Sequence, residues 1–368
     1  MEITGVTQYH LAHDLDGSFD PTWVPGYPQG SHECELFEIE TDAGITGITA
    51  SPSIPAGITY DDTLRLLLLG EDPHDVAHIR RKLASLDLLS ARPWHIEVGL
   101  WDIIGKDAGK PIHELLGTTS HEIPAYASTG EVQPADERIA YIEDRLDEGF
   151  EAVKLRITSK EDVDIVRQVR KAFPDLTLMV DANKGWAIRA IEEEEQWSFA
   201  EALAVARATS KDSTSRGSKS RCRATTTGGT PACATAPTFP SPAGSSTTDH
   251  TRSVVELLHH DAVDVLQPDA MLATGIQEGA AIAASARDQG VKFVPHTWTN
   301  GVGFAANLHV MTAARSGWCE FPMEPPLTPD ARDFLLTETL DHDEGTVTAP
   351  DGPGLGIELD RSVVDEAE

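Results

Sequence analysis

The feature that most constrains the fold is an alternation of short β-rich runs and helical segments that begins near residue 121. Five such runs are "EIPAYAST", "EAVKLRI", "TLMVDAN", "VDVLQPD" and "VKFVPH", and "WCEFPM" at 318–323 makes a sixth. Helical stretches such as "KEDVDIVRQVRKAF" lie between several of them. Alternating strands and helices indicate a parallel sheet. Polar residues at the ends of most runs are typical of a (β/α)8 barrel, whose site lies at the carboxyl ends of its strands. We therefore predict a barrel over residues 121–330, with two strands still unaccounted for.

The first 120 residues predict a separate, smaller α+β unit. The run "CELFEIETDAGITGITAS" alternates apolar and polar residues around a D-A-G turn, which is typical of a hairpin. The segments "TLRLLLLG" and "RPWHIEVGLWDIIGKDAG" instead space apolar residues three and four apart and end on glycine, which predicts helices within 61–116.

Charge excludes one class of partner. The 368 residues include 60 acidic and 29 basic side chains, a net charge of −31, with clusters such as "EEEE" at 192–195 spread along the chain. Nucleic acids need Lys and Arg against their phosphates, so we expect no nucleic-acid partner. Such a surface is typical of a protein from a salt-loving organism, although an acidic mesophilic protein would share it.

The absence of membrane-span and signal-peptide patterns and the small number of cysteines indicate where the protein is located. No run of about 18 apolar residues predicts a membrane span, and "MEITGVTQYH" does not resemble a signal peptide. The four cysteines are too few for a disulfide framework or a zinc site, so we expect a cytoplasmic protein.

One segment breaks the pattern of the chain. Residues 208–248 contain no Glu, Leu, Val, Ile or Met and consist mostly of Ser, Thr, Ala, Pro, Gly and Arg. They stand where the two missing strands should be. A disordered polar linker would have such a composition.

The ordered motifs resemble the mandelate racemase/muconate lactonizing enzyme-like branch of the enolase superfamily. They are "EVGLWDIIGKDAGKPIHELLG", "VKLRI", "LMVDANKGW", "DVLQPD" and "PHTWTNGVGFAANLHV", and the likeness covers nearly all of the chain outside 208–248. It implies an α+β capping domain (residues 1–120) on the (β/α)8 barrel (121–330), with a C-terminal segment (331–368) returning to the cap. It also implies Mg²⁺ held by three carboxylates on the third, fourth and fifth strands, and commonly a homo-oligomer.

The family pattern expects "W-[LI]-E-E-P" and "G-G-E" or "G-E" on the fourth and fifth strands, and neither is present. Codons built from the third base of each codon and the first two of the next allow "WLEEPLPRYDHGGNARLRDGTDLPIAGGE" across this segment. Its first and last Glu codons straddle Ser218–Lys219 and Gly244–Ser245, a separation typical of a strand-helix-strand unit. We therefore interpret 208–248 as a frameshift that scrambles strands 4 and 5.

The resemblance assigns roles to residues at strand ends. Asp181 matches the first metal ligand, although a helix N-cap would also place an Asp there. Lys154 and Arg156 match a K-x-K pair whose first lysine polarises the substrate carboxylate. The second position holds Arg, a poor base but a good partner for a carboxylate, unless it forms a structural ion pair.

The seventh-strand base is matched by His296 and its dyad partner by Asp269. A carboxylate on the ring selects the tautomer and raises basicity, which suits a general base. Glu320 matches a residue that hydrogen-bonds the substrate, or is a simple polar cap. Asn183 and Trp298 are candidates for substrate contacts, and "FDPTWVPGYPQGSH" at 19–32 is a candidate lid, although loop structure and packing explain these nearly as well.

Because Arg156 removes the usual second base, one acid–base group remains. That favours Mg²⁺-dependent dehydration of a sugar acid to a 2-keto-3-deoxy acid over racemisation, which needs bases on both faces. The alternatives are a cycloisomerase or racemase of a related hydroxy acid or lactone, and an inactive relative that lacks two metal ligands.

The frameshift predicts a lesion in the coding DNA. Sequencing codons 208–248 should reveal one base gained or lost near each end. If the DNA confirms the present frame and its third-frame translation lacks Glu-Glu-Pro and Gly-Glu, the interpretation is wrong.

The charge predicts stabilisation by salt. Molar KCl should raise the melting temperature, because it shortens Debye screening from about 10 Å at 0.1 M to about 2 Å at 2 M and so weakens repulsion between carboxylates. A flat or falling melting temperature over that range, followed by circular dichroism, would contradict a halophilic surface.

Overall fold

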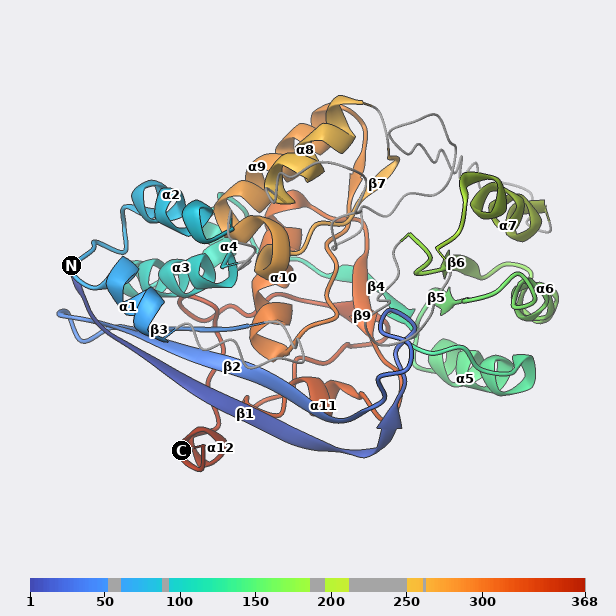
Figure 1. Cartoon of the computed structure of the whole chain (residues 1–368), viewed down its shortest axis with the longest axis horizontal. Helices are drawn as coiled ribbons and strands as arrows, with labels where there is room; N and C mark the ends of the chain where they lie inside the picture. The colour runs from blue at the N-terminus through green and yellow to red at the C-terminus, as the bar shows by residue number, and fades with distance from the viewer. Residues whose placement is uncertain (52–60, 88–92, 186–195, 212–249, 261–262, 368) are drawn as a thin grey trace.

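The computed structural model describes residues 1–51, 61–87, 93–185, 196–211, 250–260 and 263–367. In the described part of the N-terminal unit, the chain forms a three-stranded antiparallel sheet and four helices (Figure 1). Its elements are β1 (Ile3–Phe19), β2 (Gln29–Thr41), β3 (Thr46–Ala50), α1 (Asp61–Leu68), α2 (Val76–Asp87), α3 (His95–Ala108) and α4 (Ile112–Leu115). The predicted hairpin is present as β2 and β3, paired from Leu36 with Ala50 to Glu40 with Thr46.

Close backbone approach lets α3 lie on this sheet. A Cβ on Gly47 of β3 would come within 2.2 Å of the carbonyl oxygen of Gly99, and one on Gly99 within 2.8 Å of Ile39. The helix ends at Gly109, whose φ of 63° is the left-handed conformation that glycine adopts without a Cβ clash. The predicted helix and its glycine stop are thereby confirmed.

All six strands predicted after residue 121 are present and parallel where they pair. They are β4 (Ile123–Ser128), β5 (Ala152–Arg156), β6 (Thr177–Asp181), β7 (Val265–Leu266), β8 (Lys292–Phe293) and β9 (Cys319–Pro322). One sheet has the order β9-β4-β5-β6, while β7 pairs with β8. The eighth strand thus lies beside the first, as a barrel requires.

The closed ring of eight strands is not present in the described part of the chain. The sheet ends at β6 on one side, and β7 and β8 form a separate pair. The two strands assigned to the frameshifted segment would fall between β6 and β7, and residues 212–248 of that segment lie outside the described residues. The observed architecture is therefore an incomplete parallel β/α array with an α+β cap.

Helices alternate with the strands, as the spacing of apolar residues predicts. They are α5 (Ala135–Asp147), α6 (Val163–Ala172), α7 (Phe199–Lys211), α8 (His250–His259), α9 (Gly275–Asp288) and α10 (Gly301–Ala314). The short elements η1 (Ala270–Thr274, a π-helix), α11 (Pro329–Arg332), β10 (Thr346–Val347) and α12 (Arg361–Asp365) complete the chain. In α6 the buried residues Val163, Val166 and Val169 recur every three positions and form its inner face.

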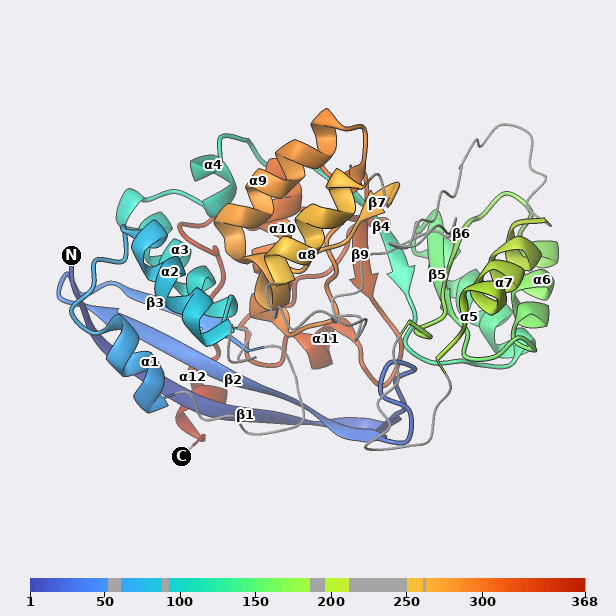
Figure 2. The same ribbon diagram turned by 45° about the horizontal axis from the view of Figure 1, so that its top comes forward.

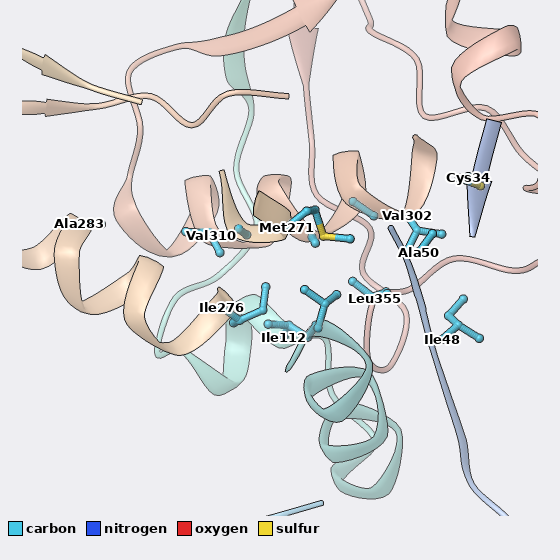
Figure 3. Packing of buried hydrophobic residues seen from close by; sticks show 14 of the residues in the cluster. Cys34, Ile48, Ala50, Ile112, Met271, Ile276, Ala283, Val302, Val310 and Leu355 are labelled. Carbon is cyan, nitrogen blue, oxygen red and sulfur yellow. The ribbon is translucent and has the colours of Figure 1, made fainter. Parts of the chain in front are cut away.

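One apolar core joins the cap to the barrel helices. Figure 3 shows it as side chains from β2 and β3, α4, η1, α9 and α10, with Leu355 from the C-terminal segment among them. Ile112, Met271, Ile276, Val302 and Leu355 are all 0% exposed. Figure 2, turned by 45° from Figure 1, shows α9 and α10 in the centre beside the cap and α5 to α7 at the opposite end of the molecule. None of the helices that the structure describes combines the length and the apolar character that a membrane span requires.

The C-terminal segment touches both units. β10 pairs antiparallel with β4 of the barrel, and Pro111 of the cap forms a β-bridge with Gly354. In α12, Arg361 forms an ion pair with Glu38 of β2. The C-terminal segment therefore contacts both the cap and the barrel and links them.

Candidate active site

Four buried or half-buried charges meet at the carboxyl ends of β5, β6 and β9, three strands of one sheet. Lys154 of β5 forms an ion pair with Glu320 of β9, and its Nζ lies 3.7 Å from Oδ2 of Asp181 on β6. Arg156 Nη1 lies 2.5 Å from the same Asp181 oxygen. Alternate residues of a strand share a face, so Lys154 and Arg156 point to the same side. The structure therefore brings these four predicted site residues together, two cationic and two anionic.

Glu320 is held as a carboxylate. It is 0% exposed, and Oε1 accepts hydrogen bonds from Lys154 and from the Ser128 hydroxyl at 2.9 Å. Oε2 accepts from the backbone N–H of Thr297 at 3.2 Å. Burial by itself raises the pKa of Glu320, but the positive charges of Lys154 and the neighbouring basic groups outweigh it and lower the pKa to about 2.

Arg156 is fixed by protein groups. Its Nε donates to the carbonyl oxygen of Thr129 at 2.6 Å, and Nη1 donates to Asp181 and, at 2.9 Å, to Oδ1 of Asn183. Burial tends to raise the pKa of Asp181, but Arg156 and then Lys154 overcome this and lower it. In this structure Arg156 thus forms the ion pair that was the alternative to a substrate contact.

The predicted base and its partner also lie together. Nδ1 of His296 is 3.0 Å from Oδ2 of Asp269, which is 0% exposed. The other oxygen, Oδ1, accepts from Met271 N at 2.8 Å and from Asn307 Nδ2 at 3.1 Å. The hydrogen bonds from Met271 and Asn307 favour the ionised form of Asp269, which can only accept. Nδ1 of His296 therefore carries the hydrogen, and in the neutral ring Nε2 has a free lone pair. The His296 side chain is 21% exposed, whereas Asp269 is fully buried.

An aromatic cluster closes one side of these charges. Trp298 stacks on Phe19 at 5.8 Å with planes 7° apart, and Trp23 meets Trp298 edge-on at 4.8 Å. The Arg156 guanidinium lies 5.1 Å from the Trp23 ring and 5.6 Å from the Trp298 ring. The Trp298 indole N–H donates to Ser128 at 2.9 Å. Both tryptophans are therefore held by packing, in addition to any contact with a substrate.

The connection between β1 and β2 brings this cluster to the barrel. Thr22 donates from its backbone to the Gly130 carbonyl at 3.0 Å and from its hydroxyl to Asn183 at 2.9 Å. Asn183 has a φ of 48°, a left-handed conformation that Asn tolerates better than most residues. The segment that sequence reasoning named as a lid, 19–32, thus contacts the site through its first residues.

The described residues do not form a magnesium site. They contain no group of three His, Cys, Asp or Glu side chains that could hold a metal ion. Asp181, the predicted first ligand, has its carboxylate against Arg156 and Lys154 instead. Mg²⁺ prefers several oxygen ligands, so one carboxylate already paired with two cations does not fit it.

Sequence reasoning missed two residues that organise the site. Ser128 links Trp298 to Glu320, and its only signal was a polar residue at the end of a strand. Asn307 supports Asp269 from the middle of α10, where it reads as one more helical residue in an apolar stretch. Both are buried with 0% exposure.

Family models match the chain over most of its length. The model described as "Enolase C-terminal domain-like" matches residues 137–214 and 241–363, and "Mandelate racemase / muconate lactonizing enzyme, N-terminal domain" matches 29–117. The break from 215 to 240 falls inside the segment of unusual composition.

Whole-length relatives are also found. The chain is 32% identical to D-galactarolactone cycloisomerase of Agrobacterium fabrum, covering 100% of this chain and 98% of the relative. It is 27% identical to arabinonate dehydratase of Saccharolobus solfataricus, covering 99% and 98%. A crystal structure of an enolase superfamily member from Polaromonas sp. JS666 superposes with a TM-score of 0.77 at 23% identity, covering 100% and 97%, and supports the capped-barrel fold.

The lowered pKa of Glu320 predicts acid sensitivity. The ordinary pKa is 4.5, so this carboxylate contributes stability that is complete above pH 4.5 and is lost as the pH falls toward 2. The full effect is on the order of 3 kcal/mol, and roughly half of it is lost by pH 3.5. The free energy of unfolding in urea should therefore differ between wild type and Glu320→Gln at pH 7, and the gap should narrow below pH 4.5. Glu143→Gln, on the exposed face of α5, is the control and should show no such narrowing. A gap that stays constant from pH 6 to 3.5 would contradict an ionised Glu320.

Proposed function

The chain belongs to the mandelate racemase/muconate lactonizing enzyme-like branch of the enolase superfamily, and from this membership we propose that it dehydrates a sugar acid. The product would be a 2-keto-3-deoxy acid. The observation that carries the proposal is the Asp269–His296 pair beside Lys154 and Glu320. Relatives named as an arabinonate dehydratase and a galactarolactone cycloisomerase support a sugar acid or its lactone as the substrate class.

The pair supplies both proton transfers that dehydration needs. Nε2 of His296 takes the proton next to the substrate carboxylate, and the C–H electron pair forms an enediolate. The resulting imidazolium is stabilised by Asp269 through the Nδ1 hydrogen bond. It then gives the proton to the β-hydroxyl, which leaves as water while the carbon–carbon double bond forms. The enol product tautomerises to the keto acid.

The charges around the site limit what the present chain can do. Lys154 and Arg156 are balanced by Glu320 and Asp181, so these four side chains sum to zero charge. An enediolate of a carboxylate carries two negative charges, and stabilising it needs fixed positive charge. We therefore extend the proposal to residues 208–248. If their reading frame were restored, the fourth and fifth strands would add carboxylates beside Asp181 and provide the Mg²⁺ site that the family implies.

A second activity is favoured by one observation. The cycloisomerase of Agrobacterium fabrum is 32% identical along the entire chain. Opening a lactone by β-elimination also uses a single acid–base group, which takes the α-proton while the ring oxygen leaves. Product analysis with a library of acid sugars and their lactones separates the two activities, because only dehydration releases water. The stereochemistry of α-deuterium incorporation separates both from racemisation.

A non-enzymatic relative is the third alternative. If the frame of residues 208–248 is real, we expect the chain as it stands to bind Mg²⁺ poorly and to convert no sugar acid. Magnesium titration by calorimetry distinguishes this form from a restored one. Cytoplasmic location and homo-oligomeric assembly remain expectations from the sequence.

Replacing the base gives the direct test. In a chain with strands 4 and 5 restored, His296→Asn should abolish dehydration, a loss of at least about 100-fold, because the proton acceptor is gone. Mg²⁺ affinity should stay the same. Asp181→Asn should weaken both, since it removes a proposed ligand. Asp269→Asn should leave the fold intact but hold the imidazole of His296 in the wrong tautomer, which should lower kcat strongly.

The readouts are coupled assays of keto-acid formation and calorimetric Mg²⁺ titration. Full activity in His296→Asn would overturn the assignment of the base. Family-level turnover by the chain with residues 208–248 unchanged would overturn the assignment of the metal site.

A further inference from the structure

Two buried histidines lie together where the cap, the barrel and the C-terminal segment meet. His113 of α4 and His309 of α10 are 1% and 0% exposed, although they lie 196 positions apart in the sequence. Their rings stack at 5.2 Å with planes 19° apart, and the two Nδ1 atoms are 3.1 Å apart. Ile112 precedes His113, Val310 follows His309, and the carbonyl oxygen of Leu355 lies against the His309 ring. All three residues belong to the shared apolar core (Figure 3). Neither histidine has a part in the proposed reaction.

The hydrogen bonds assign the protons on both rings. Nε2 of His309 lies 3.0 Å from the carbonyl oxygen of Leu355, which can only accept, so Nε2 carries a hydrogen. In a neutral ring Nδ1 of His309 is then an acceptor. It faces two donors of His113, the backbone N–H at 3.3 Å and the ring Nδ1–H at 3.1 Å. The remaining nitrogen, Nε2 of His113, has a free lone pair.

This arrangement accepts one proton and rejects a second. Nε2 of His113 lies 3.8 Å from Asp351, a carboxylate whose side chain is 75% exposed, so a proton there forms an ion pair and leaves the other hydrogen bonds unchanged. A proton on Nδ1 of His309 would instead point at two donors. It would also place a second positive charge in a buried site next to the first. Protonation of His309 therefore opposes its hydrogen bonds to His113 and favours breaking them.

The surrounding charges do not relieve that conflict. Around His113, Asp351 and Glu114 favour its charged form and His121 opposes it, but burial is the largest effect and lowers the pKa of His113. Burial also lowers the pKa of His309 to about 4, with a further contribution from His113. On the far side of Leu355, Asp102 of α3 accepts its backbone N–H at 2.8 Å. That carboxylate is already paired with Lys106.

We propose that His113 and His309 form a pH-sensitive clasp that holds the cap and the C-terminal segment on the barrel at neutral pH and opens in acid. Opening separates α4 and Leu355 from α10. The same helix carries Asn307, which supports Asp269, so opening also loosens the dyad. That effect on catalysis rests on the proposed function, whereas the opening itself does not.

The sign of the pH dependence follows from the two states. In the open clasp His309 titrates near its ordinary 6.5, and in the closed clasp near 4. The closed form therefore loses stability as the pH falls from 6.5 toward 4. Between pH 7 and pH 5 the closed-to-open ratio should fall about 20-fold.

Hydrogen–deuterium exchange on the full chain tests the clasp. After correction for intrinsic exchange rates, protection of peptides covering 112–118 and 354–356 should fall about 20-fold between pH 7 and 5 in the wild type. In His309→Gln, which keeps a donor for Leu355 but cannot titrate, it should change less than about 3-fold. A β5 peptide monitors global unfolding, because buried His32, whose pKa burial also lowers to about 4, destabilises the whole fold in acid. His260→Gln, at a histidine with 62% of its side chain exposed, is the matched control and should behave as wild type.

Two further variants keep the test decisive. If His309→Gln does not fold, His113→Gln removes the ring-to-ring hydrogen bond and keeps both the backbone N–H donor of residue 113 and the bond of His309 to Leu355. Protection of the two peptides at pH 7 should then be lower than in the wild type, and unchanged protection would overturn the clasp. Asp351→Asn should make the clasp more acid-sensitive, because it removes the charge that stabilises the first proton, and a purely structural pair would not respond in this way. Equal loss of protection in wild type and His309→Gln, or an equal loss in β5, would overturn the proposal.

Discussion

The ion pairs of Lys154 with Glu320 and of Arg156 with Asp181 hold the carboxyl ends of the sheet in one arrangement. They connect β9, β5 and β6, and Ser128 adds β4 through its bond to Glu320. Removing one partner of a buried pair leaves an uncompensated charge, at a cost of about 3–5 kcal/mol. The ends of β4, β5, β6 and β9 are therefore held to one another, and Phe19 and Trp23 of the cap pack against Trp298 beside them.

The helix α10 connects this surface to the rest of the molecule. Its Asn300 side chain caps its first turn, and just before it lie His296 and Trp298. Its middle supports Asp269 through Asn307, and two residues further on His309 reaches the cap. Because α10 carries both Asn307 and His309, we infer that the position of the cap and the geometry of the Asp269–His296 pair depend on the same helix. A single barrel helix thus contacts both the base's partner and the cap.

The segment 208–248 lies between two parts of the chain that match the family pattern. The family models match up to residue 214 and resume at 241, and the sheet is interrupted between β6 and β7. The charges at the site agree with this gap. Among the described residues, Asp181 forms ion pairs with Lys154 and Arg156 and has no second carboxylate as a metal co-ligand. An out-of-phase reading of this segment accounts for the composition and for both missing motifs, and it remains our proposal.

Much of the fold was predictable from the sequence alone. The hairpin, the helices of the cap and six parallel strands follow from the period of apolar residues and from glycine stops, which are local properties of the chain. The residues at the strand ends were predictable for the same reason, since parallel strands deliver their carboxyl ends to one edge. Only the tertiary structure decided how these groups pair. Whether Arg156 faces a substrate or Asp181, whether Asn307 supports a carboxylate, and whether His113 meets His309 depend on side chains brought together from distant positions. Packing between elements sets those contacts, and no local pattern encodes them.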